Sequence, residues 1–119
     1  MNPFDLLRTT ERRLGVRYPP RKETTATCHR GTLGLGRDLA LSVLDLSDIG
    51  GRLVLSEPLD RGQVVEVALQ APGWAAAVKR LGVIVWVEAT GVEGYEAGII
   101  FSRSLEFNDL RDLCYLPEF

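Results

Sequence analysis

The sequence predicts an all-β domain that ends in a single helix, and three observations support this fold class. Apolar and β-branched residues occur in short runs. Turn signals rich in glycine and proline separate these runs at close intervals, and helical spacing of apolar residues is clear only near the C-terminus. The chain has 119 residues, of which 45% are hydrophobic and 25% charged, so it can bury a core as one domain.

The first half of the chain contains three expected strands. Thr24–His29 is rich in β-branched residues, and a glycine-rich connection over residues 31–36 leads to the apolar run Leu39–Leu46. A Gly-Gly turn then leads to a third run, Arg52–Ser56. Each of these runs has the length and the boundaries of a single strand.

The second half adds further expected strands and the helix. Gln63–Gln70 alternates between apolar and polar residues, as in a half-buried strand, and Tyr95–Ser102 follows a glycine turn. Between them lie two apolar stretches, Ala75–Arg80 and Gly82–Ala89, and Trp86 is expected in the core because valines surround it. Apolar residues recur at helical spacing over Glu106–Cys114, which predicts the only clear helix.

Six or seven short strands with close turns indicate an antiparallel barrel or sandwich. A parallel α/β sheet is excluded because no crossover helices are expected between the strands. We divide the chain into an N-terminal arm over residues 1–22, a β-domain over 23–104, and a C-terminal helix and tail over 105–119. The arm has a short helical pattern at Phe4–Arg12 and ends at two prolines that keep its backbone extended.

Charge is distributed unevenly along the chain. Residues 1–37 hold eight basic and three acidic residues, a net charge of +5, whereas the remainder nets −7. A basic arm on an acidic body favours a small anionic ligand over nucleic acid or a membrane surface. No apolar run is long enough to span a membrane, the start resembles no secretory signal, and the two cysteines are expected as free thiols in a reducing cytoplasm.

Two short motifs carry the functional signal. The arm contains Arg12-Arg13-Leu14-Gly15-Val16-Arg17, and Asp45-Leu46-Ser47-Asp48-Ile49-Gly50 follows between two expected strands. Arginines grip phosphates or stack on a purine, a carboxylate accepts from the N–H groups of a base, a hydroxyl donates, and a glycine permits close approach. Each motif alone is more often a solvated arginine pair or an ordinary turn.

In this order, the two motifs resemble those of the PilZ domain, a bacterial receptor domain for cyclic di-GMP. That family carries an RxxxR motif in an N-terminal loop and a (D/N)xSxxG motif further along the chain. The valine–tryptophan run at residues 83–87 and the run at 95–101 are also similar to the family's, so the resemblance covers about residues 11–102. It implies a six-stranded antiparallel barrel with an N-terminal arm and a short C-terminal helix.

The resemblance also implies the roles of the motif residues. Arg13 and Arg17 would hold phosphates and stack on guanine, and Arg12 could take the place of Arg13. The carboxylate and the hydroxyl would read a guanine edge, and the glycine would keep the turn tight. The implied ligand-binding residues are Arg12, Arg13, Arg17, Asp45, Ser47 and Gly50.

We therefore expect a non-catalytic receptor that orders its arm on cyclic di-GMP and signals to an effector protein. We expect no cofactor, no nucleic-acid partner and no membrane insertion, and a homodimer is left open. The alternative is a PilZ-like module that works through protein contacts and binds no nucleotide, which the stiff stretch Tyr18-Pro19-Pro20-Arg21 suggests. A barrel for single-stranded nucleic acid is a weaker third possibility.

Other chemistries find little support in the sequence. Cys28-His29 has no second cysteine–histidine cluster with which to complete a zinc site. His29 is the only histidine and lies in an expected strand, so a Ser-His-Asp arrangement is not credible. The glycine-rich connection at 31–36 precedes no helix and is not expected to cradle phosphates. The chain is expected not to be an enzyme.

Overall fold

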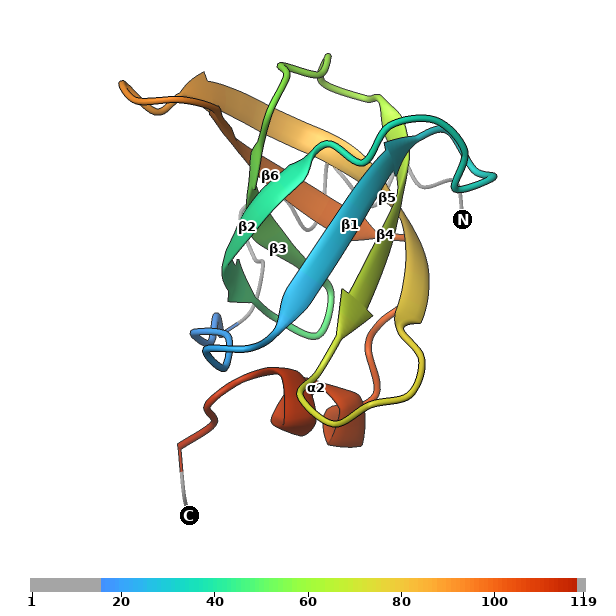
Figure 1. Cartoon of the computed structure of the whole chain (residues 1–119), viewed down its shortest axis with the longest axis vertical. Helices are drawn as coiled ribbons and strands as arrows, with labels where there is room; N and C mark the ends of the chain where they lie inside the picture. The colour runs from blue at the N-terminus through green and yellow to red at the C-terminus, as the bar shows by residue number, and fades with distance from the viewer. Residues whose placement is uncertain (1–15, 118–119) are drawn as a thin grey trace.

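Six strands form one antiparallel sheet that curls into a nearly closed barrel, with one short helix near the C-terminus (Figure 1). This computed structural model describes residues 16–117, and the helical pattern predicted at Phe4–Arg12 lies outside them. The predicted fold class is confirmed. The elements are β1 (Thr25–Arg30), β2 (Ala40–Leu46), β3 (Gly50–Leu55), β4 (Val64–Gln70), β5 (Val78–Ala89), β6 (Tyr95–Phe101) and α2 (Phe107–Leu113).

The strands follow the order β1-β4-β5-β6-β3-β2 around the barrel, so β1 and β2 are the two edges that meet. They are joined at one end, where the Leu39 amide donates to the Cys28 carbonyl at 2.8 Å. The Asp38 carboxylate supports this junction by accepting from the backbone N–H groups of Cys28 and Ala40, both at 2.9 Å. This junction makes the sheet a barrel rather than a sandwich.

The structure has six strands, the lower of the two numbers predicted. The two stretches expected on either side of Leu81 form a single long strand, β5, with a register shift between Ile84 and Trp86. Gly82 lies within this strand. A Cβ atom at this position would lie 2.7 Å from Ile99 Cγ2, inside the barrel. The glycine makes room for close packing between β5 and β6, and the shifted register lets β5 bend around the barrel.

Alternation along the strands builds the core. The most buried large side chains inside the barrel include Leu53, Leu69, Ile84 and Ile99, each at most 2% exposed. A second, smaller cluster forms from residues of β5 and β6 that alternate with these. Its buried members are Val83, Val85 and Ile100, with Ile49 and Trp86 packed against them.

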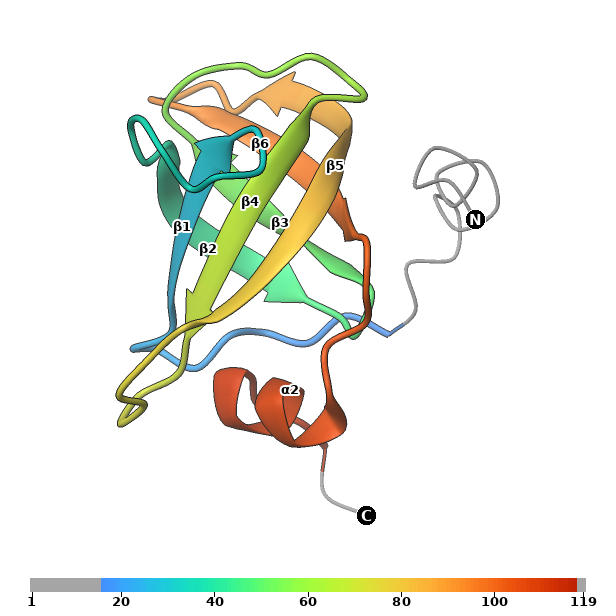
Figure 2. The ribbon, with the colours of Figure 1, turned by 90° about the vertical axis from the view of Figure 1, so that its right-hand side faces the viewer.

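The chain before β1 passes between one end of the barrel and α2, as Figure 2 shows. The Tyr18 amide donates to the Leu46 carbonyl at 2.8 Å, and the Leu46 amide donates back at 3.0 Å. On its other side, this segment meets the C-terminal region. There the Thr24 hydroxyl donates to the Leu113 carbonyl at 2.6 Å and the Tyr115 amide donates to the Pro19 carbonyl at 3.0 Å.

Helix α2 is held by packing and has no side-chain cap at its N-terminus. Leu110 and Leu113 form its buried face, and the chain leaves the helix at Cys114 in an extended conformation. Among the residues that the structure describes, no helix is long and apolar enough to cross a membrane.

Candidate ligand-binding site

The serine–glycine motif forms the turn between β2 and β3. The Ser47 amide donates to the Gly50 carbonyl at 2.8 Å, which closes the turn. The Ser47 hydroxyl also lies within the turn: it accepts from the Ile49 amide at 3.3 Å and is 3.4 Å from the Gly50 carbonyl oxygen. These two distances are longer than ordinary hydrogen bonds, so the hydroxyl is held weakly.

The two glycines of the turn are required by space. A Cβ atom on Gly50 would overlap the carbonyl oxygen of Ile99 in β6, and one on Gly51 would lie 2.8 Å from the carbonyl oxygen of Asp45. Neither residue has a positive φ. Gly50 therefore brings β3 against β6, and this close contact explains its presence without a ligand.

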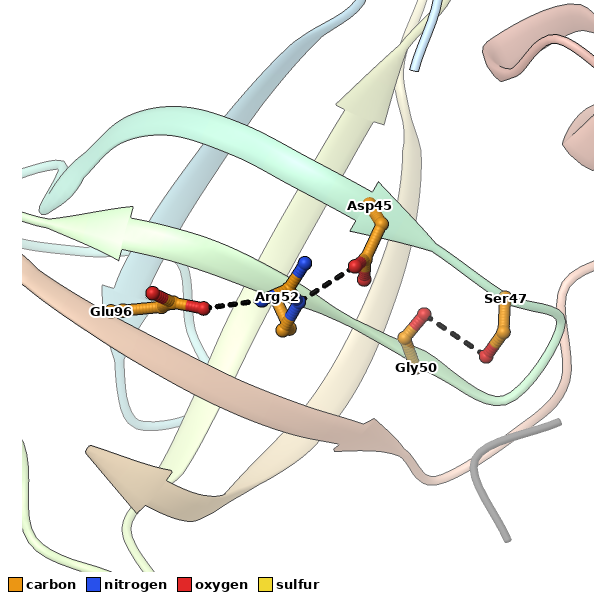
Figure 3. A network of polar contacts seen from close by, with 5 residues as sticks. All are labelled: Asp45, Ser47, Gly50, Arg52 and Glu96. Atoms are coloured by element: carbon orange, nitrogen blue, oxygen red, sulfur yellow. Dashed lines mark hydrogen bonds and ion pairs between the residues drawn. The ribbon is translucent and has the colours of Figure 1, made fainter. Parts of the chain in front are cut away.

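A row of charged residues crosses β2, β3 and β6 beside the turn, as Figure 3 shows. Arg52 Nε donates to Asp45 Oδ2 at 2.6 Å, and Arg52 Nη1 donates to Glu96 Oε1 at 2.5 Å. We call these three residues the Arg52 network. Hydrogen bonding to Asp45 is the largest cause of a raised pKa for Arg52. The network has one cation and two carboxylates, so it carries one surplus negative charge.

One carboxylate oxygen atom of Asp45 has no partner in this network. The residue is only 7% exposed, and its Oδ1 atom is buried without a hydrogen-bond partner among residues 16–117. A buried acceptor without a partner costs about 1–3 kcal/mol. Such atoms are rare in folded proteins and mark places where a ligand or an ordered water belongs.

An aromatic ring continues the row onto β5. Arg52 is paired with Gly98 in β6, and Gly98 is paired with Trp86 in β5, so the side chains of these residues share one face of the sheet. A Cβ atom on Gly98 would overlap the indole of Trp86, so the ring lies directly over the glycine. Trp86 is half-buried and packs against the second apolar cluster, so the expectation that it lies in the core is confirmed only in part.

The structure brings one arginine of the RxxxR motif to this site. Arg17 is exposed and directly precedes Tyr18, which pairs with Leu46 between Asp45 and Ser47. Among the described residues, Arg17 has no ion pair or hydrogen bond. The motif's other arginines, Arg12 and Arg13, lie outside residues 16–117.

Sequence reasoning missed three members of the site: Arg52, Glu96 and Trp86. Arg52 has a recognisable signal, since it is a polar position two residues after the motif glycine in an alternating strand. Glu96 and Trp86 join the site only through the register of β6 against β3 and β5, which no local pattern reveals.

No group of three or more potential metal-ligating side chains occurs within residues 16–117. Comparison of the chain with models of known families, with curated proteins and with solved structures finds no match. The resemblance to the PilZ family thus stays a prediction that depends on the motif residues and their order.

Proposed function

We propose that this protein is a non-catalytic receptor for cyclic di-GMP, of the PilZ type, that acts in the cytoplasm. The ligand would lie on the face of the barrel that carries Asp45 and Trp86, with the arm folded over it. Ordering of the arm would then change the surface that an effector protein recognises.

The observation that carries this proposal is the unpaired Oδ1 atom of Asp45. A guanine edge presents two adjacent N–H donors, N1–H and N2–H, and donors of this kind satisfy a carboxylate. Adenine presents a ring acceptor beside its amino group, which a carboxylate repels. The surplus negative charge of the Arg52 network favours a donor edge at this position, so guanine fits better than adenine.

The phosphates require cations, and the arm supplies them. Arg17 stands at the β2 edge with no partner among the described residues, and the motif's other arginines, Arg12 and Arg13, precede it in sequence. Charge-assisted hydrogen bonds to phosphate contribute about 1.5–3 kcal/mol each. Trp86 adds a ring on the same face, on which a base can stack.

A PilZ-like interaction module that binds no nucleotide is the second candidate. Its specific support is that Ser47 Oγ and Asp45 Oδ2 already have partners within the protein. The two candidates differ in whether the site binds nucleotide at all.

Calorimetric titration with cyclic di-GMP tests the proposal, with GTP as the control ligand. We expect saturable binding, and we expect Arg17→Ala and Ser47→Ala each to weaken it by about ten- to a hundredfold, because each removes one hydrogen-bond donor. Arg37→Ala is the matched control, since it removes an exposed arginine at the far end of the barrel. Absence of saturation near about 100 μM ligand, an affinity of roughly −5.5 kcal/mol, would favour the interaction module.

A further inference from the structure

An apolar groove lies between α2 and the segment that leads from Val16 toward β1, and Figure 2 shows this segment passing beside the helix. The groove has a volume of about 340 Å³. Two of its apolar side chains are open to solvent, since Phe107 is 69% exposed and Val16 is 68% exposed. The other apolar or aromatic residues that line it within residues 16–117 are Tyr18, Leu105, Leu110 and Leu116.

The described part of the fold makes little use of the two exposed side chains. Helix α2 is anchored by Leu110 and Leu113, which are 5% and 0% exposed. Neither Phe107 nor Val16 belongs to either apolar cluster. Exposed apolar side chains that gather around a groove mark a place where another segment or molecule packs.

The chain's own N-terminal arm begins in this groove. Val16 is both a groove residue and the first residue that the structure describes, so residues 1–15 continue directly from it. The pairing of Tyr18 with Leu46 fixes this starting point on the barrel. Because each residue spans at most about 3.6 Å, Leu14 must lie within about 7 Å of Val16.

The arm has a segment that suits an apolar groove. The helical pattern predicted over Phe4–Arg12 places Phe4 and Leu7 one turn apart, on the same side of the helix. Gly15, which directly precedes Val16, allows the chain to turn back. A helix over this range is only about 14 Å long, and isolated helices of this length are marginal in water. It therefore needs a surface against which to pack.

The covalent link favours the arm over any separate partner. A segment joined to the groove by a few residues has an effective concentration in the millimolar range, which a second copy or a free peptide reaches only in very concentrated solution. Charge does not decide the occupant. The groove is lined by the carboxylate of Asp48, but Arg17 lies between two of its lining residues.

We propose that the arm folds back onto this groove in the ligand-free protein, so that Phe4 and Leu7 pack against Phe107 and Val16. The contact needs no nucleotide and is independent of the proposed receptor function. It would hold the arm at the end of the barrel where the β2–β3 turn lies, because Asp48 of that turn lines the groove.

Amide hydrogen exchange of the purified full chain, measured without nucleotide by mass spectrometry, tests the proposal. We expect the amides of residues 5–12 to exchange at least about tenfold more slowly than those of an unstructured peptide. Phe107→Asp and Leu7→Asp should each abolish this protection, whereas Phe107→Leu should keep most of it. Circular dichroism checks that the barrel of each variant is folded.

Two matched controls introduce the same charge elsewhere. Val92→Asp changes a side chain that is 82% exposed and does not line the groove. Thr9→Asp changes the opposite side of the predicted arm helix, so it tests whether the side that carries Leu7 matters. Both control variants should retain the protection of the wild type.

The protein concentration separates the arm from a second copy as the occupant. Protection within one chain should be the same at about 10 μM and about 1 mM protein, because no association is involved. Protection that grows with concentration would assign the groove to another copy and overturn the proposal. A wild-type arm without protection, full protection in Phe107→Asp, or a Thr9→Asp variant as impaired as Leu7→Asp would overturn it as well.

Discussion

The Arg52 network and the Glu57 clasp are opposite arrangements of the same charges. The first shares one arginine between two carboxylates, and the exposed fractions of its side chains are 10–33%. The second is formed by Arg30, Glu57 and Arg37 at the β1–β2 loop. It shares one carboxylate between two arginines, and the exposed fractions of its side chains are 36–69%. The difference shows where charge is costly. The unpaired oxygen atom of Asp45 in the first is buried away from bulk solvent, whereas water compensates the surplus cation of the second.

The glycines of the two regions differ in what constrains them. Gly50 lies in the β2–β3 turn because a side chain there would collide with β6. Gly31, at the start of the β1–β2 loop, has a φ of +82° and no atom within 4 Å of the position of a Cβ. The turn is thus constrained by packing and the loop by backbone conformation, which makes the turn the less tolerant of the two.

The largest expected effect comes from Gly50→Ala. The added methyl group would push apart β3 and β6, and we expect a loss of about 3 kcal/mol of unfolding free energy, at the upper end of overpacking costs. Gly31→Ala should cost about 1 kcal/mol, from the left-handed backbone alone. Urea denaturation measures both. Equal losses in the two variants would contradict the distinction between packing and backbone conformation.

Removal of Arg52 should cause the next largest loss of unfolding free energy. In Arg52→Ala the buried Asp45 carboxylate loses its cation, and we expect a loss of about 2–3 kcal/mol in unfolding free energy. Arg37→Ala, its counterpart in the exposed clasp, should change stability by no more than about 0.5 kcal/mol. A clasp variant as unstable as the network variant would show that burial does not separate the two networks.

The smallest expected effect concerns the two thiols, one near each region. Burial raises the pKa of Cys28 in β1 to about 12 and that of Cys114, beside the arm, to about 11. Both thiols therefore stay protonated at pH 8 and should react slowly with iodoacetamide. Peptide mass spectrometry should find Cys114 alkylated first, because a short terminal segment opens more readily than the middle of a strand. Alkylation of Cys28 first would contradict this order.

The same thiols contribute to the pH dependence of stability. Their folded pKa values lie above the ordinary value of 9.0, so the unfolded chain loses these protons first. Their contribution to stability is complete below pH 9 and falls as the pH rises toward 11–12.

Local patterns in the sequence are sufficient to predict the fold class and most element boundaries, because alternation and turn residues act over a few positions. The choice between six and seven strands stayed open, since the role of Gly82 depends on Ile99 from a distant strand. The turn motif at residues 45–50 was recognisable because its members are close neighbours in the sequence. The partnership of Asp45 with Arg52, and the place of Trp86 over Gly98, depend on strand register, which local patterns do not encode.

The most direct measurement compares cyclic di-GMP with cyclic di-AMP in calorimetric titrations of the wild type, Asp45→Ala and Glu57→Ala. If Asp45 Oδ1 receives a guanine edge, the wild type should bind cyclic di-GMP at least about tenfold more tightly than cyclic di-AMP. Asp45→Ala should lose most of this preference, while Glu57→Ala, which changes only the exposed clasp, should keep it. Equal affinities for the two dinucleotides, or an unchanged preference in Asp45→Ala, would contradict the assignment of this atom to a guanine ligand.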